Sequence, residues 1–324
     1  MKIGSTLNDG KVADRINNEI RRRNSDPRGI IFRTFLQLGL FLALLILTVL
    51  LVDVVQNGWG TLSTRFGDFL SGTLRSRSID EKLGVHQGLV GSFWIAVTTA
   101  IVAFPIGIGA AIYLEEYAPK NRLTRFIEIN IRNLAGVPSV VYGLLGLFIF
   151  VNTFGKWTGG KSLLSAALTL SILVLPIVII TASEAIRATP QSLREGAYGV
   201  GATRWEVVRR QVLPYAAPGI LTGTLLAMSR AIGEAAPLIL VGAVTGRLGT
   251  TPGFLDLGAL KERFVAMPIV ITEWTQNSGR DPGFAGAAAA AIVVLLIFVL
   301  ALNSIAILLR NRFEKRRKLS LIHI

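Results

Sequence analysis

The chain of 324 residues contains no cysteine and only two histidines, His86 and His323. Without cysteine there can be no disulfides and no thiolate ligands, and two isolated imidazoles do not make a metal-binding cluster, so we expect no metal site. Charged residues are also scarce, at 17% of the chain, whereas hydrophobic residues make up 51%. The mean hydropathy of +0.55 is far from the balance of a soluble domain. The composition therefore predicts a membrane protein.

Uncharged runs long enough to cross a bilayer recur along the chain. A hydrocarbon core about 30 Å thick needs roughly 20 helical residues. Five uncharged runs meet this length, and a sixth does so only if two charged residues enter the membrane with it. The five runs lie within 33–53, 82–115, 132–156, 161–184 and 281–310, and the sixth lies within 210–247. We predict an all-α membrane protein with six transmembrane helices.

Lys and Arg are distributed unevenly between the predicted loops. With six spans, both termini and the loops 115–132 and 184–210 share one side, and this side carries most of the positive charge. Positively charged loops usually stay in the cytoplasm, so we expect both termini there. The basic ends are interpreted as anchors at the lipid surface rather than as nucleic-acid sites.

The predicted organisation has five parts. They are a cytoplasmic basic arm (1–32), a first transmembrane helix (33–55), an external segment (56–88), a five-helix core (89–309) that includes a cytoplasmic loop (184–217), and a cytoplasmic basic tail (310–324).

Residues 155–162, GKWTGGKS, match the phosphate-binding P-loop pattern G-x-x-x-x-G-K-[ST] at every position. A true P-loop follows a buried strand in a soluble domain. Here the apolar run 133–154 precedes the motif, and the predicted orientation puts the motif outside the cell. We interpret the stretch as a glycine-rich hairpin between two spans. Any ATP that the protein uses must then be bound by another chain.

The longest predicted cytoplasmic connection contains two helix-start patterns. SLRE (192–195) and TRWE (203–206) both have the S/T-x-x-E spacing of a capping box. Gly199 and Gly201 should separate two short helices, and Pro214 should end the second one. We predict a helix-turn-helix elbow that lies on the membrane.

One face of the first short helix is apolar, because Leu193, Ala197 and Val200 share it. Such a face needs a partner. Local physics does not decide whether this partner is another protein or the transmembrane helices of the same chain.

The elbow resembles the EAA loop of ABC importer permeases, whose pattern is E-A-A-x3-G-x9-I-x-L-P. Glu195, Ala197, Gly201, Leu213 and Pro214 fall on its positions, whereas Gly196 and Gln211 depart from it. In that family the first short helix is a coupling helix that docks on a cytoplasmic ATP-hydrolysing subunit. The resemblance implies a coupling role for five residues, Leu193, Glu195, Gly196, Ala197 and Gly201.

Two charged residues interrupt the fifth apolar run. Arg230 and Glu234 are four residues apart and can pair on one helix face. A central Arg costs roughly 2.5–3.5 kcal/mol on insertion scales, and such residues usually face a bundle interior or a water-filled path. Gly223 and Ala227 precede the pair at helical spacing, and their small size favours an interior face.

We predict that Arg230 and Glu234 line the path of an oxyanion. A guanidinium can donate two parallel hydrogen bonds to a phosphate-like group, and Glu234 would orient it and limit its affinity. Gly233 and Pro237 should interrupt the helix just beyond, which is tolerated at membrane depth where the chain lines a cavity. A purely structural ion pair between helices is the alternative.

The stretch SRAIGEAAPL (229–238) resembles the signature of phosphate-importer permeases, specifically of the PstA type, and the resemblance covers most of the chain from about residue 85. It implies a MetI-like permease core with a peripheral first helix in a bacterial inner membrane. It also implies four kinds of partner: a second permease of the PstC type, two ATP-binding subunits of the PstB type that hold ATP and Mg, an external phosphate-binding protein of the PstS type, and lipid. The chain itself would carry no catalytic residue and no cofactor.

Two other functions remain open from the sequence. An ion-coupled secondary transporter or channel for an anion would use Glu234 as an ion site but would leave the elbow without a purpose. A membrane-embedded enzyme would need clustered His or acidic residues at one membrane face, and the sequence offers none.

Overall fold

The computed structural model describes residues 27–246, 248–251 and 253–322, with side chains between residues 29 and 311 except at positions 247, 252, 306 and 309. His323 and most of the predicted N-terminal arm lie outside the described residues. The chain divides into two compact units, Met1–Val54 and Val55–Ile324, which are described separately.

Helix α2 (Pro27–Ser71) contains the predicted first span and continues well past its predicted end at residue 55. Within the first unit, residues 29–53 are all exposed. So large an apolar surface requires a covering of lipid or protein. In the second unit the helix changes direction at Arg65, whose φ of −145° and ψ of 42° are not helical.

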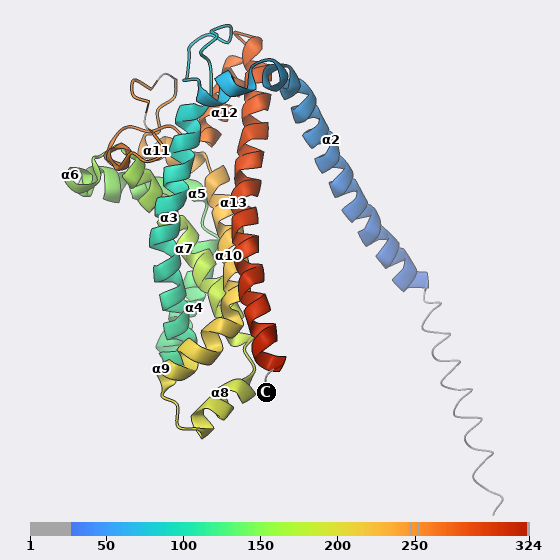
Figure 1. Cartoon of the computed structure of the whole chain (residues 1–324), viewed down its shortest axis with the longest axis vertical. Coiled ribbons are helices and arrows are strands. Elements are labelled where there is room, and N and C mark those ends of the chain that lie inside the picture. Colours follow the sequence, from blue (N-terminus) through green and yellow to red (C-terminus); the bar gives the residue numbers. More distant parts are fainter. Residues whose placement is uncertain (1–26, 247, 252, 323–324) are drawn as a thin grey trace, which may run out of the picture. The chain divides into compact units, whose positions relative to one another are not determined.

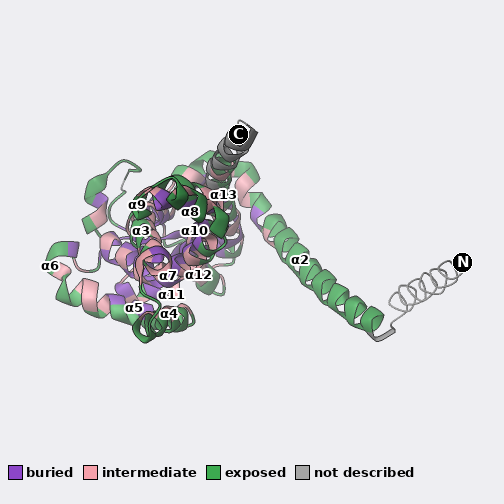
Figure 2. Cartoon of the chain, turned by 90° about the horizontal axis from the view of Figure 1, so that it is seen from below, coloured by how far each residue is buried: buried purple, intermediate pink, exposed green. Residues whose placement is uncertain are grey.

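Four long helices form the body of the second unit (Figure 1). They are α3 (His86–Ile112), α7 (Leu163–Arg187), α10 (Leu213–Gly233) and α13 (Gly283–Ile322). Helix α7 packs against both α3 and α10, and α10 also packs against α13. Buried residues concentrate around α7, whereas α4 and α8 are mostly exposed (Figure 2). Helix α7 therefore connects the helices that pack around it.

Glycines allow these helices to approach closely. A Cβ atom on Gly107 of α3 would meet the side chain of Val178 of α7, and one on Gly223 of α10 would meet that of Thr181. The close approach predicted at Gly223 is therefore confirmed, and it involves α7.

Five helices of the described residues are long and apolar enough to cross a membrane. They cover residues 29–71, 86–117, 163–187, 204–233 and 283–305. The predicted all-α membrane architecture is confirmed.

The sixth candidate span is a bent pair of helices. Helix α4 (Arg122–Ala135) turns by 100° into α5 (Ser139–Gly146) and the π-helical η2 (Leu147–Thr153). The span predicted within 132–156 is therefore part of a bent pair rather than one continuous helix, and the pair is the sixth candidate span. Pro138 explains the bend, because a proline disfavours helical backbone at the residue before it, here Val137. Helix α4 packs along α7, whereas α5 packs against α7 and α11 (Ala236–Val241).

The segment between α2 and α3 is folded onto the core, although the sequence did not explain it. The side chain of Gln87, 1% exposed, accepts a hydrogen bond from the Leu74 N–H at 3.0 Å and donates one to the Leu248 carbonyl at 3.2 Å. Ser78 donates to the Asp281 carboxylate from its N–H (2.8 Å) and its hydroxyl (2.5 Å). Asp281 precedes α13 and follows α12 (Met267–Asn277). These bonds join the segment before α3 and the first turn of that helix to the loops that precede and follow α12.

Candidate functional site

The fifth span is broken at the predicted charged pair. Helix α10 ends at Gly233, and Glu234 is extended, with φ −80° and ψ 116°. Helix α11 then begins at Ala236, with Pro237 in its first turn. A proline there lacks only an N–H that has no partner in the helix. The predicted interruption is confirmed, and Glu234 stands in the break.

The Arg230 side chain contacts Glu234 in this break. Its Nε lies 3.5 Å from Oε1 of Glu234, and the two side chains are 56% and 20% exposed. Thr222, Leu226 and Arg230 are all exposed and follow one another at one-turn spacing. Gly223 packs against Thr181 of α7, whereas Arg230 two turns on is exposed within this chain, so the interior face expected for Arg230 stays a prediction. The guanidinium is accessible within this chain.

The elbow begins with α8 (Gln191–Gly199). The capping box predicted at residues 192–195 is wrong. Pro190 precedes the helix, with φ −56° and ψ 137°, and makes no side-chain cap. Since the helix starts at Gln191, Ser192 is already inside it and cannot act as the N-cap residue. After α8 the chain turns at Gly201, whose φ of +84° lies in the left-handed region.

The second capping box is confirmed. Glu206 N–H donates to the Thr203 hydroxyl at 3.4 Å, and Thr203 N–H donates to the Glu206 carboxylate at 2.9 Å. Helix α9 (Arg204–Val207) starts there and continues through the π-helical η3 (Val208–Val212) into α10.

The predicted helix end at Pro214 is wrong. Leu213 N–H bonds to the Val208 carbonyl, five residues back, which is the wider spacing of a π-helix. An extra residue in the turn relieves the clash that a proline ring makes with the carbonyl four residues earlier. The elbow therefore leads without interruption into α10.

The five predicted coupling residues lie on α8 and the turn after it. Glu195, Gly196 and Gly201 are exposed, whereas Leu193 and Ala197 are half-buried. Ala197 packs toward a cluster of buried residues that includes Ile186 and Val207, but Val200 is 86% exposed. The predicted apolar face is therefore divided, with Ala197 turned to this chain and Val200 turned outward.

A cleft of about 350 Å³ lies beside the elbow. Its lining residues are Ala197, Val200, Gly201, Ala202, Glu206, Arg210 and Gln211. Trp205, 54% exposed, and Val200 add apolar surface nearby. This mixture of apolar and charged groups can receive another protein.

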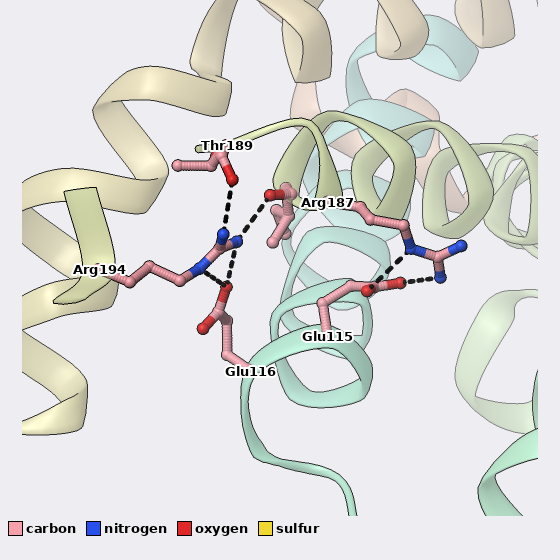
Figure 3. Close-up of polar contacts among 6 residues, drawn as sticks. Glu115, Glu116, Arg187, Thr189 and Arg194 are labelled. Atoms are coloured by element: carbon pink, nitrogen blue, oxygen red, sulfur yellow. Dashed lines mark hydrogen bonds and ion pairs between the residues drawn. The ribbon is translucent and has the colours of Figure 1, made fainter. Parts of the chain in front are cut away.

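Two ion pairs lie at the ends of the long helices, and one of them also involves the elbow (Figure 3). Both start from η1 (Tyr113–Tyr117), which continues α3. Arg187, at the end of α7, donates to Glu115 at 3.2 and 2.6 Å. Arg194, on α8, donates to one oxygen of Glu116 at 3.2 and 2.9 Å. Sequence reasoning missed both glutamates and Arg187, although adjacent acids at the end of an apolar run are a visible signal.

The P-loop-like stretch has a structural role. Helix η2 precedes it, followed by the one-turn α6 (Gly155–Thr158). Gly159 and Gly160 have φ values of +89° and +72°. Ser162, fully buried, accepts from Ser165 N–H and so caps the start of α7. The serine of the motif thus starts a helix that follows another helix, which is the context of a turn between two membrane helices.

The described residues contain no group of three His, Asp or Glu side chains placed to hold a metal ion. His86 instead packs edge-on against the ring of Phe254, with centroids 5.6 Å apart.

Residues 103–319 match the model of the family described as "Binding-protein-dependent transport system inner membrane component". The chain belongs to this family. The predicted membership among ABC permeases is confirmed, and the matched range covers all the elements of the site described above.

Curated relatives of the permease are similar over most of its length. It is 34% identical to the probable ABC transporter permease protein YqgI of Bacillus subtilis, over 80% of this chain and 86% of the relative. It is 33% identical to the phosphate transport system permease protein PstA 1 of Mycobacterium tuberculosis, over 89% of each chain. The PstA of Mycobacterium leprae is 39% identical over 69% of this chain and 71% of that protein.

Solved structures support the fold of the permease. A chain of a bacterial ABC transporter involved in import of the acidic polysaccharide alginate superposes with a TM-score of 0.60, covering 90% of this chain and 99% of that chain at 14% identity. A chain of the MetNI methionine ABC transporter, in an inward-facing conformation, gives 0.51 over 72% and 95% at 17% identity. The predicted MetI-like architecture is confirmed.

Proposed function

We propose that the permease is the PstA-type subunit of an ATP-driven importer for inorganic phosphate. The observation that best supports this proposal is an exposed guanidinium, that of Arg230, at a helix break inside a predicted span. The relatives of the chain include phosphate transport permeases. A guanidinium is always charged and can donate two parallel hydrogen bonds to a phosphate. A positive charge that spends part of the transport cycle at membrane depth attracts an anion there.

Glu234 makes binding reversible in this proposal. At 3.5 Å from Arg230 Nε it offers a competing acceptor, so phosphate must displace it on arrival and is displaced when it leaves. The extended backbone at Glu234 leaves peptide groups outside any helix, and polar backbone at membrane depth is tolerated where it lines a cavity.

The exposed stripe of α10 calls for a partner. Leu226 is 69% exposed in the middle of this helix. A second permease of the PstC type would cover the apolar part of this stripe and enclose the path around Arg230. The second permease would then form the part of the path's wall that this chain does not form.

ATP hydrolysis belongs to other chains in this proposal. Two subunits of the PstB type bind ATP and Mg and dock on α8 and the adjoining cleft, while a PstS-type protein delivers phosphate on the opposite side. Both termini and α8 then face the cytoplasm of the bacterial cell. The permease contributes the path and the connection to the ATPase, and carries no cofactor.

Purification of the tagged permease together with its associated chains, followed by reconstitution in vesicles, tests the proposal. We expect a copurifying ATPase and uptake of labelled phosphate that requires ATP and a phosphate-binding protein, with sulfate as the comparison anion. Uptake driven by an ion gradient in the absence of ATP would instead support a secondary transporter. ATP-driven uptake of sulfate but not phosphate would overturn the assignment of the substrate.

A further inference from the structure

Arg194 is bonded to three residues at once. Beyond its two bonds to Glu116 of η1, it donates to the Thr189 carbonyl at 2.6 Å and the Ile186 carbonyl at 2.9 Å, at the end of α7 (Figure 3). Its Nε, Nη1 and Nη2 atoms are therefore all engaged. Through one side chain, α8 is joined to the end of α7 and to the π-helical continuation of α3.

Apart from Arg194, α8 packs mainly on α9 and η3, which lead into α10. None of its residues is buried, and Ala197 makes its apolar contact while only half-buried. Arg194 and Glu116, in contrast, are 14% and 7% exposed. This ion pair and the two carbonyl contacts are therefore the side-chain connection from α8 to α3 and α7, beside the packing of α8 on α9 and η3.

The chemistry of the contact suits a firm connection. Carbonyls at the carboxyl end of a helix carry partial negative charge, which a cation stabilises. A guanidinium presents its donors in a rigid fork, so it meets a carboxylate and two carbonyls with less loss of conformational freedom than a lysine would. Because Glu116 is buried, removing its partner leaves an uncompensated charge.

We propose that Arg194 is the positioning residue that transmits movement of α8 to α3 and α7, with Glu116 as its partner. The inference rests on the proposed function, because the movement must come from an ATPase docked on α8. The neighbouring pair of Arg187 and Glu115 joins η1 to α7 but not to α8, so it takes no part in this transmission.

Arg194→Gln and Glu116→Gln, each in the reconstituted complex, test this role. We expect the ATPase subunits still to copurify, because Glu195 and Val200 on the outer surface are unchanged, and ATP hydrolysis to continue. The number of ATP molecules hydrolysed per labelled phosphate taken up should rise at least about fivefold, the low end of typical coupling between two sites. Arg194→Lys should restore part of the coupling.

Arg187→Gln is the matched control, and its ratio should stay within about twofold of the unsubstituted complex. Glu116→Gln keeps the shape of the side chain and leaves the carbonyl contacts of Arg194 in place, so it remains informative if Arg194→Gln does not assemble. An unchanged ratio in both α8-linked variants, or an equal rise in Arg187→Gln, would overturn the inference. Absence of ATP-driven uptake in the unsubstituted complex would instead refute the proposed function.

Discussion

Arg230 and Arg194 illustrate how the surroundings of one residue type divide its roles. The side chain of Arg194 is 14% exposed, and its donors are taken by a carboxylate and two carbonyls. The side chain of Arg230 is 56% exposed and lies near one carboxylate, at 3.5 Å. A guanidinium whose donors are occupied joins elements, whereas one with donors to spare can bind an anion.

Replacement of Arg230 should remove phosphate uptake without dismantling the complex. Charge-assisted hydrogen bonds contribute about 1.5–3 kcal/mol each, so Arg230→Ala should lower uptake at least about tenfold. Arg230→Lys keeps the charge but loses the paired donors, and should retain part of the uptake. Labelled-phosphate uptake and copurification of the partner chains measure the two effects. Normal uptake by the alanine variant would exclude Arg230 from the path.

Gly201 provides a second prediction at this scale, based on backbone strain. Its φ is +84°, and no atom of another residue lies within 4 Å of the position that a Cβ would take, so a side chain there meets strain but no clash. A non-glycine residue in this region costs about 1–2 kcal/mol. We expect Gly201→Asp to displace α8 and to raise the ratio of ATP hydrolysed to phosphate transported.

Gly199→Ala is the matched control for this turn, because Gly199 has ordinary helical backbone and open space around it. Gly201→Asn should lie between the two, since asparagine tolerates left-handed backbone better than most residues. Equal ratios for the Asp variant and the Gly199→Ala control would show that the shape of the turn does not matter for coupling.

Prolines lie inside several of the long helices. Pro105 is in α3, Pro176 in α7 and Pro218 in α10, and none of them ends its helix. A proline breaks a helix where the freed carbonyl has no other partner and neighbouring elements do not hold the two halves together. Pro138 differs because it lies outside a helix, at the N-cap position of α5, where the chain bends between α4 and α5.

The contact between α7 and α10 depends on the absence of a side chain at Gly223. Overpacking a close helix contact typically costs about 1–3 kcal/mol, so Gly223→Val should lower the thermal stability of the purified permease. Thr181→Ala removes Oγ1 and Cγ2, two of the three Thr181 atoms that the new side chain would meet, and leaves Cβ. The double variant should therefore recover part of the loss, as measured by thermal unfolding in detergent.

Gly109→Ala on α3 is a control for the helix-propensity effect, because nothing lies within 4 Å of a Cβ there. If Thr181→Ala failed to relieve Gly223→Val, the loss would have to come from the remaining Thr181 Cβ or from a different neighbour.

At the scale of the whole molecule, polar bonds between distant segments close the α12 end of the second unit. Ser78 and Asp281 are separated by 203 residues, and Gln87 and Leu248 by 161. Glu273 likewise accepts from the Gly246 N–H at 2.6 Å. These bonds hold the loops around the ends of the helices in one arrangement.

The bond between Ser78 and Asp281 predicts a pH dependence of stability. Hydrogen bonds from the Ser78 hydroxyl, and then from its N–H, lower the pKa of Asp281. A lowered pKa in the folded state stabilises that state above the unfolded pKa of about 3.9, and this contribution disappears as the pH falls through the folded pKa. Asp281→Asn should therefore melt at a lower temperature than the original chain at pH 7, with the difference shrinking below about pH 3.9.

Thermal unfolding of both chains in detergent across this pH range measures the effect. Ser78→Ala should reproduce part of it, because it removes the largest cause of the lowered pKa. A difference in melting temperature that did not change with pH would mean that the carboxylate charge is irrelevant to the contact.

The sequence alone determined the features that depend on composition and on local spacing. Uncharged runs of about 20 residues must form helices in lipid, because their backbone groups have no other partners there. The capping box at Thr203, the pair of Arg230 and Glu234, and the helix break beyond Arg230 each arise from residues within a few positions of one another. The resemblance of the elbow to the EAA loop was also readable from a short stretch.

Only the tertiary structure decided which distant residues meet. Glu116 and Arg194 are separated by 78 positions, and nothing in their local sequences selects one for the other. The bend at Pro138 and the passage of a helix through Pro214 are likewise seen only in the structure, because a proline alone does not specify whether the chain bends or continues as a π-helical turn. Contacts across four residues follow from helix geometry, whereas contacts between helices follow from how their surfaces fit, and that fit is a property of the whole fold.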